Sequence, residues 1–475
     1  MKMVKSLLLG SAAGVVAMAG AQAADLPVKA KPVQYVKICS LYGAGFYYIP
    51  GTDTCIKIGG FVRAEVNFNA GGSFSSLQSG SVDGSATQGK TETWRTRAAV
   101  TLDTRSQTEY GTLRSYFVVA TTETNGQTIN AGFPGGPGVG NVPGGSGTTP
   151  YTALWSNAAF IQFAGFTAGK TASFFDFDTM AYSNQTNVWG SNYAGAGIQV
   201  FAYTAQFGNG MSASLSLEQP SARRESITGQ EVTISGTGGG LTYGTAAGQY
   251  GNQEVPDIVA NLRIDQTWGS AQVMGAYHQL RTISGTAPSP TLVTHDDSAW
   301  AFGGGLKVNL PMIGSHDYAI VQGTYSEGVL SYAGQGINGG FNLTNNDGTS
   351  RAVGPALDAV ILADGSLDKT KAWSVTGGFE HFWTPQWKTS LYGAYGQVRY
   401  SDDASLVLTG GATGVSLDWN LGQIGSRTVW TPVANLDLSL EVMYNRLNTA
   451  AGNVAGFEDK DWFSGIFRIQ RNFYP

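Results

Sequence analysis

The sequence predicts an all-β fold, a transmembrane antiparallel β-barrel of 16 strands with short periplasmic turns and long extracellular loops. Three observations lead to this prediction: an export signal at the N-terminus, a recurring period-two alternation of apolar and polar residues, and connections that are alternately short and long. The composition agrees. Only 13% of the residues are charged and 42% are hydrophobic, as expected when each strand turns one face to lipid and the other to water.

The N-terminus has the features of a secretory signal peptide. Lys2 and Lys5 precede a short apolar run at residues 7–17, and Ala-Gln-Ala at residues 21–23 is a small-residue cleavage pattern. This run is about half the roughly 20 residues that a transmembrane helix needs. We therefore expect residues 1–23 to be removed after export and any membrane insertion to use strands.

A short segment separates this signal from the predicted barrel. Residues 24–54 are expected to be periplasmic, because the first strand of such a barrel starts from that side. Cys39 and Cys55 are the only two cysteines. They lie close together in an exported chain, so a disulfide is predicted for the oxidising periplasm, with two buried thiols as the alternative. The barrel is assigned to residues 55–475.

The first predicted strand, residues 55–68, illustrates the alternation. Ile58 and Val62 fall on one face of the extended chain, whereas Arg63 and Glu65 fall on the other. The pattern recurs through the chain, and the even number of segments suits a single-chain bacterial barrel. The predicted strands lie near residues 55–68, 92–103, 111–122, 157–164, 166–173, 197–207, 211–219, 257–267, 270–281, 299–309, 317–328, 371–383, 387–399, 416–430, 436–447 and 461–473.

The connections between these segments alternate in length. Short ones such as 208–210 and 268–269 are followed by long ones such as 220–256 and 282–298. Short periplasmic turns and long outer loops give a barrel this alternation, whereas a sandwich, a propeller or a solenoid does not require it. The alternation therefore favours the barrel.

Two stretches resemble the porins of alphaproteobacteria, which are general diffusion porins of the Gram-negative outer membrane. They are CSLYGAGFYYIPGTDTC at residues 39–55, followed by IKIGGFVR, and AFIQFAGFTAGKTASFFDF at residues 159–177. The resemblance implies a trimeric barrel in outer-membrane lipid and lipopolysaccharide, through which small hydrophilic solutes diffuse passively. It also implies that the assembly machinery reads Phe473 as the terminal aromatic signal, although Tyr474 and Pro475 follow it here.

The resemblance further implies a constriction inside the pore. In general porins the third long loop folds inward and sets acidic groups opposite a basic wall. Here that loop covers residues 174–196, with Asp176 and Asp178 as the candidate acids and its phenylalanines as contacts to the inner wall. The water-facing register of the strands supplies a candidate basic wall, made of Lys57, Arg63, Arg95, Arg97, Arg114 and Arg468. The alternative for each wall residue is a structural pair with a nearby carboxylate, such as Glu65 or Asp103.

Other classes of function find little support in the sequence. The 28 basic and 33 acidic residues give a net charge of −5, and loss of Lys2 and Lys5 with the signal makes it about −7, which argues against nucleic acid as a partner. Neither zinc-ligand spacing nor a phosphate-binding loop is present. The His295-Asp296-Asp297 cluster is typical of a solvated loop. We therefore predict no enzymatic activity, no cofactor and no metal.

Two other readings within the barrel fold stay open. One is a substrate-specific outer-membrane channel with an aromatic slide, and the other is a non-conducting structural or adhesive barrel at the cell surface. Several aromatic residues, such as Trp300, Trp383, Trp387 and Tyr392, fall beside turns or on apolar faces, which is typical of interfacial girdles. This placement favours general diffusion over a specific channel. The preferred ion is left open, because the predicted wall is basic while the chain as a whole is acidic.

Overall fold

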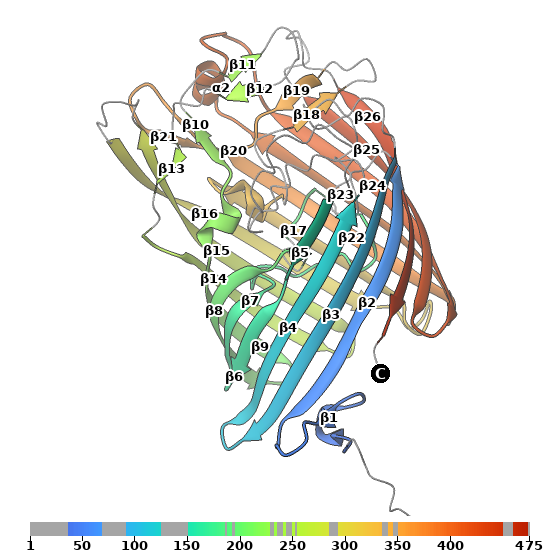
Figure 1. Cartoon of the computed structure of the whole chain (residues 1–475). Helices are drawn as coiled ribbons and strands as arrows, with labels where there is room; N and C mark the ends of the chain where they lie inside the picture. Colours follow the sequence, from blue (N-terminus) through green and yellow to red (C-terminus); the bar gives the residue numbers. More distant parts are fainter. Residues whose placement is uncertain are drawn as a thin grey trace, which may run out of the picture.

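The protein is a tall barrel of tilted strands, with a small N-terminal unit at one end and most of the short strands outside the barrel wall at the other (Figure 1). The computed structural model describes residues 37–68, 92–124, 151–185, 188–191, 195–228, 232–234, 241–243, 249–251, 254–284, 293–334, 341–344, 350–449 and 459–473. The predicted signal peptide therefore lies outside the described residues, as do Tyr474 and Pro475.

The barrel consists of 16 antiparallel strands, counting β5 and β6 as two segments of one strand. Each strand pairs with its neighbours in the sequence, and β26 pairs with β2 to close the ring. In chain order the barrel strands are β2 (Cys55–Phe68), β3 (Glu92–Thr108), β4 (Gly111–Thr124), β5 (Tyr151–Trp155), β6 (Ala159–Phe163), β7 (Phe166–Thr171), β8 (Ile198–Gly208), β9 (Met211–Glu218), β14 (Asp257–Gln266), β15 (Gly269–Ser284), β16 (Val293–Asn309), β17 (Tyr318–Glu327), β22 (Lys371–Thr384), β23 (Trp387–Arg399), β24 (Trp419–Val433), β25 (Leu436–Thr449) and β26 (Lys460–Asn472).

The predicted strands match the observed ones one to one, which confirms the predicted fold. Two strands begin six residues earlier than predicted, and one of them is β16, which begins at Val293 rather than near residue 299. The extra residues pair with the end of β15, where Ser284 lies opposite Val293, so this hairpin extends beyond the stretch of clean alternation. The other is the strand predicted near 157–164: its β6 segment is preceded by β5, which pairs Tyr151–Trp155 with β4.

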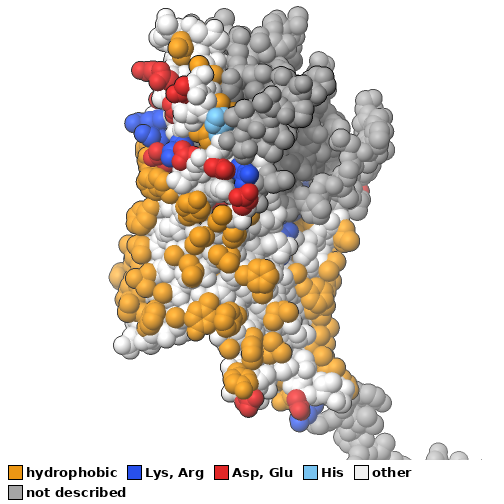
Figure 2. Space-filling view, turned by 90° about the vertical axis from the view of Figure 1, so that its left-hand side faces the viewer, with side chains coloured by type: hydrophobic (Ala, Val, Ile, Leu, Met, Phe, Trp, Pro, Cys, Tyr) orange, Lys and Arg blue, Asp and Glu red, His pale blue; other side chains and the backbone are white. Residues whose placement is uncertain are grey.

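The outer surface of the barrel is an apolar belt. Side chains at alternate strand positions are exposed although they are large and hydrophobic, as a lipid-facing surface requires. Figure 2 shows hydrophobic side chains gathered over the barrel wall, with charged groups concentrated toward its ends. Examples from around the ring are Val62, Phe201, Leu215, Val273, Phe302, Val321, Leu391, Ile424, Leu440 and Phe467.

Smaller elements lie at the two ends and in the loops. No helix of the described residues is both long and apolar enough to cross a membrane. In chain order, the smaller elements are η1 (Ser40–Tyr42), β1 (Tyr47–Tyr48), η2 (Pro220–Arg223), β10 (Ser226–Thr228), β11 (Val232–Ile234), β12 (Leu241–Tyr243), β13 (Gln249–Tyr250), η3 (Leu330–Tyr332), β18 (Phe341–Thr344), β19 (Ser350–Gly354), β20 (Leu357–Ile361), β21 (Leu367–Lys369) and α2 (Asp402–Leu408).

Candidate pore constriction

The connection between β7 and β8, residues 172–197, runs inside the barrel. Its described residues contact inward-facing side chains on strands far along the chain: Gln322 on β17, Glu441 on β25 and Ser464 on β26. We call this connection the inner loop. Because its partners lie on the wall opposite β7, the inner loop crosses the interior before it returns to β8.

Side chains of the wall hold the backbone of the inner loop. Inside a barrel the N–H groups of an irregular segment need acceptors, and polar side chains supply them here. Gln322 accepts from the backbone N–H of Asp178 at 2.8 Å. Glu441 accepts from the N–H groups of Asn184 at 2.6 Å and Gln185 at 2.9 Å, at the point where the inner loop reaches β25. In the same way, Glu218 accepts from the backbone N–H of Phe174, and Gln423 accepts from that of Val188.

Aromatic rings of the inner loop pack onto glycines of the wall. A Cβ atom added at Gly396 would lie 2.5 Å from the Trp189 ring, and one added at Gly378 would lie 2.8 Å from the ring of Tyr182. Only a residue without a side chain allows so close an approach. The phenylalanines of the loop behave as predicted, since Phe175 and Phe177 are buried against β15 and β16 residues. The inner loop is therefore fixed by packing as well as by hydrogen bonds.

A group of arginines on β2, β3 and β26 lies beside the tip of the inner loop. Its centre is Glu65, which is 2% exposed and pairs with both Arg95 and Arg468. Arg468 also donates to the side-chain oxygen of Asn184 at 2.8 Å and thereby links the wall to the loop. Arg95 and Arg468 thus form the structural ion pairs with a carboxylate that were the alternative to a role in the constriction. Arg468 contacts the inner loop as well.

Two further arginines complete this group, which we call the arginine cluster: Arg63, Arg95, Arg97 and Arg468. Arg63 lies opposite Arg97 in the pairing of β2 with β3. Arg97 is buried with its guanidinium 5.1 Å from the centre of the Trp155 ring. Arg63 is only partly buried and donates to the side-chain oxygen of Gln470 at 2.7 Å.

Lys57 and Arg114 lie away from the cluster. Lys57 is six residues before Arg63 on the same strand, a separation of about 20 Å, and its ammonium contacts the backbone oxygen of Ala44 at 3.2 Å. Arg114 is three residues beyond the start of β4 and pairs with Asp103 at 3.0 Å, near the periplasmic end. Both groups share the inward register that the sequence predicts, but they stand at another height of the barrel.

The two acids of the inner loop are turned away from water. Asp176 accepts from the Ser191 hydroxyl and lies 3.5 Å from the Arg223 guanidinium, and its side chain is 2% exposed. Asp178 accepts from the Tyr182 hydroxyl at 2.6 Å and is 1% exposed. Burial raises the pKa of Asp178 above its ordinary value. Asp176 and Asp178 therefore do not face the water of the lumen, although the sequence led us to expect them on the acidic side of the constriction.

Comparison with known proteins agrees with this geometry. Residues 25–466 match the family described as "Porin subfamily". The chain belongs to the porin family. Porin Omp2b of Brucella suis biovar 1 (strain 1330) is 33% identical over 58% of this chain and 66% of its own length. Porin Omp2a of Brucella melitensis biotype 1 is 34% identical over 56% of this chain and 68% of its own. The chain thus spans about two thirds of these relatives.

A solved structure shares the fold of this porin. The outer membrane channel DcaP of Acinetobacter baumannii superposes with a TM-score of 0.56 at 16% identity, and the match covers 90% of this chain and 99% of that one. The alphaproteobacterial resemblance is confirmed by the Brucella relatives. Family and fold together identify an integral β-barrel of the outer membrane. They also indicate a channel rather than an enzyme.

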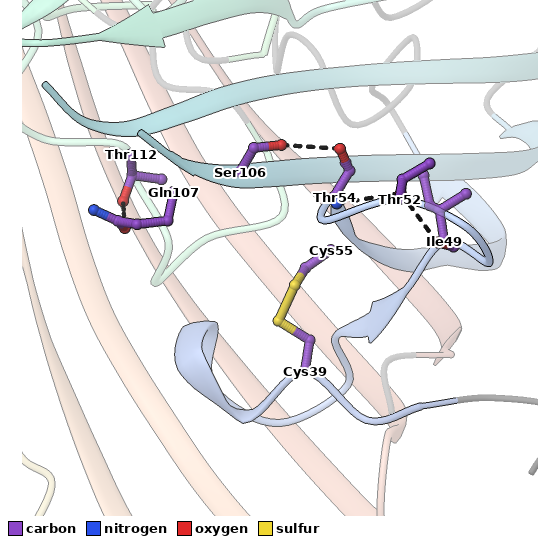
Figure 3. Close-up of a disulfide and its surroundings, with 8 residues drawn as sticks. All are labelled: Cys39, Ile49, Thr52, Thr54, Cys55, Ser106, Gln107 and Thr112. Atoms are coloured by element: carbon purple, nitrogen blue, oxygen red, sulfur yellow. Dashed lines mark hydrogen bonds between the residues drawn. A yellow bond between two sulfur atoms is a disulfide. The ribbon is translucent and has the colours of Figure 1, made fainter. Parts of the chain in front are cut away.

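The porin has a disulfide at its periplasmic end, as predicted. Cys39 and Cys55 are bonded with Cα atoms 6.0 Å apart, where the N-terminal unit meets the start of β2 (Figure 3). The hydroxyl of Thr54, beside the disulfide, lies 2.9 Å from that of Ser106 on β3. The ring of Phe46 packs 4.8 Å from the Arg105 guanidinium, so cation–π contacts also fasten the unit to the barrel.

Phe473 lies at the seam where the barrel closes. Its backbone N–H donates to the oxygen of Gly60 at 3.0 Å, and its ring covers Gly60 on the lipid-facing side. The ring is 42% exposed. This is an accessible position for the assembly signal that the sequence predicts.

One aromatic residue was placed wrongly by the sequence. Tyr392 points inward, is 3% exposed and donates to Glu441, whereas Trp300, Trp383 and Trp387 are exposed as expected of a girdle. Tyr392 shares the register of Ser390, so the alternation alone could have placed it inside. The acceptors Gln322 and Gln423 were missed, because a lone polar residue on an inward face gives no sign of its partner.

Proposed function

We propose that this porin is a passive channel through which small hydrophilic solutes and ions diffuse across the outer membrane. The observation that carries the proposal is the inner loop, which is fastened to the inner wall at Gln322, Gln423 and Glu441. A barrel of 16 strands encloses a lumen wide enough for water, and a loop fastened against its wall narrows that lumen to a selective passage.

The constriction is proposed to lie between the inner loop and the arginine cluster. The contact between Arg468 and Asn184 supports this location, because it joins the two at the loop tip. Lys57 and Arg114 are left out because they lie nearer the periplasmic end, and Asp176 and Asp178 are left out because they are buried. Solutes are proposed to pass through the water-filled part of the lumen without any covalent step or cofactor.

The assembled form is proposed to be a homotrimer in contact with outer-membrane lipid and lipopolysaccharide. The family supports it, and the exposed apolar belt supplies a surface for lipid or for a second copy. Insertion by the assembly machinery is proposed to use Phe473. Residues 1–23 are proposed to be removed as the signal peptide, with residues 24–54 forming a periplasmic segment ahead of the barrel.

Liposome swelling tests the proposed channel. Vesicles that contain the folded protein are diluted into isosmotic solutions of neutral sugars of increasing size. We expect swelling rates that fall smoothly with solute size, because size alone decides entry into a general diffusion pore. Swelling for one sugar out of line with its size would support a substrate-specific channel instead. No swelling from a correctly folded barrel would contradict both and favour a structural protein.

A further inference from the structure

The charges around the proposed passage are unevenly distributed. The inner loop, residues 172–197, contains two acidic residues, Asp176 and Asp178, and no basic one. Both carboxylates are directed toward protein groups and are nearly inaccessible to water. The side of the passage formed by the loop is therefore close to neutral.

The opposite side is basic. The arginine cluster brings four guanidinium groups around one carboxylate, that of Glu65, which is enclosed between Arg95 and Arg468. Arg63 is the partly exposed member of the cluster. Among the described residues, its one hydrogen bond goes to the neutral amide of Gln470. Arg63 is therefore the member of the cluster with the most exposed surface and without a carboxylate partner among the described residues.

We infer that the passage is selective for anions, and that small carboxylates are among the solutes it favours. This inference rests on the channel proposed above. A positive charge on one side of a narrow passage, opposite a loop whose two carboxylates are buried, raises the local concentration of anions and lowers that of cations. Guanidinium groups also pair with carboxylates through two parallel hydrogen bonds, which a passing carboxylate forms transiently.

Arg63 is the residue to which this selectivity is assigned. A unit charge about 5 Å from the path of an ion in water changes the local ion concentration by about fourfold. Replacing Arg63 by Gln removes the charge and keeps a polar side chain of similar length. The expected result is a loss of about sixteenfold in the ratio of chloride to potassium permeability, because chloride loses about fourfold and potassium gains about fourfold, with conductance retained. Screening by salt makes the effect larger at low ionic strength.

Arg471 offers a matched control. It lies on β26, opposite Val62 in the strand pairing and next to Arg63, but its side chain faces outward and donates to the backbone oxygen of Ala434. Arg471→Gln therefore removes the same charge at a similar height without changing the lumen. We expect its selectivity to match that of the unmodified protein.

The experiment measures reversal potentials of the purified protein in planar bilayers, first across a gradient of potassium chloride and then of potassium acetate. The inference predicts anion-selective potentials for both salts, a reduced preference for Arg63→Gln and no change for Arg471→Gln. Cation-selective potentials would overturn the inference and leave the channel intact. An anion preference unaffected by Arg63→Gln would overturn the assignment to Arg63. A folded barrel without conductance would instead refute the proposed channel.

Discussion

Glu441 offers the sharpest test of how the inner loop is held. Its carboxylate is fully buried and accepts from two backbone N–H groups, those of Asn184 and Gln185, and from the Tyr392 hydroxyl. Replacing Glu441 by Ala removes the acceptor and leaves these donors unsatisfied in the interior of the barrel. We expect the tip of the loop to detach more often.

The size of the effect follows from the bonds that are lost. Each hydrogen bond to a charged group contributes about 1.5–3 kcal/mol, so two together hold the tip by about 3–6 kcal/mol. We expect a loss of about 3 kcal/mol, the lower end of this range, because the Ala variant no longer has to bury a carboxylate and regains that desolvation energy. A change of about 3 kcal/mol raises the equilibrium constant for detachment roughly a hundredfold.

The assay is single-channel recording of Glu441→Ala beside a matched control. Asp437 lies on the same strand and the same inward face, four residues nearer the periplasmic end, and accepts from Thr431 rather than from the inner loop. We expect Glu441→Ala to show added current noise and an altered conductance, and Asp437→Ala to behave like the unmodified protein. A quiet Glu441→Ala channel of normal conductance would refute the idea that this carboxylate positions the loop.

Three other predictions concern stability. Burial raises the pKa of Asp358 to about 6, so protonation of this carboxyl stabilises the fold by up to about 3 kcal/mol; the contribution is complete below about pH 4 and is lost as the pH rises through 6. Asp358→Asn should flatten the pH dependence of the unfolding temperature in heat-induced gel shifts. An unchanged pH dependence would contradict this prediction. Val442, near the middle of β25, has an outward side chain and is 49% exposed. Val442→Arg should lower the free energy of unfolding by about 2–4 kcal/mol in urea titrations in vesicles, whereas Val433→Arg at the rim should lower it by about 1 kcal/mol or less. Equal losses for the two variants would contradict the assigned apolar belt. Loss of the disulfide in Cys39→Ser should cost the N-terminal unit about 3 kcal/mol and expose it to protease while the barrel stays folded; unfolding of the barrel as well would show that the two are coupled.

The strands were predictable because their signal is local. In β25, Leu440 and Val442 alternate with Ser439 and Glu441, and that pattern fixes both the strand and the side to which each residue points. Register also placed Arg63, Arg95 and Arg468 inside correctly. Their height in the barrel needed one more step, which is to count residues from the nearest turn. That count would have separated Arg114, three residues into β4, from the cluster.

The path of the inner loop was not predictable in the same way. Its contacts join residues far apart in the sequence, such as Asp178 with Gln322, which are 144 positions apart. An acidic residue on an inward-folding loop was expected to face water, because charge is costly to bury. Asp176 is buried nevertheless, because Arg223 from another connection lies beside it. No pattern within the loop itself reveals a partner supplied by a different segment.

Single-channel current in a planar lipid bilayer shows whether the barrel with its inner loop encloses an open, water-filled passage. We expect large, stable current steps from the purified protein, with closures in thirds of the full current if three barrels assemble. A protein that is folded and inserted, yet carries no current, would contradict this expectation.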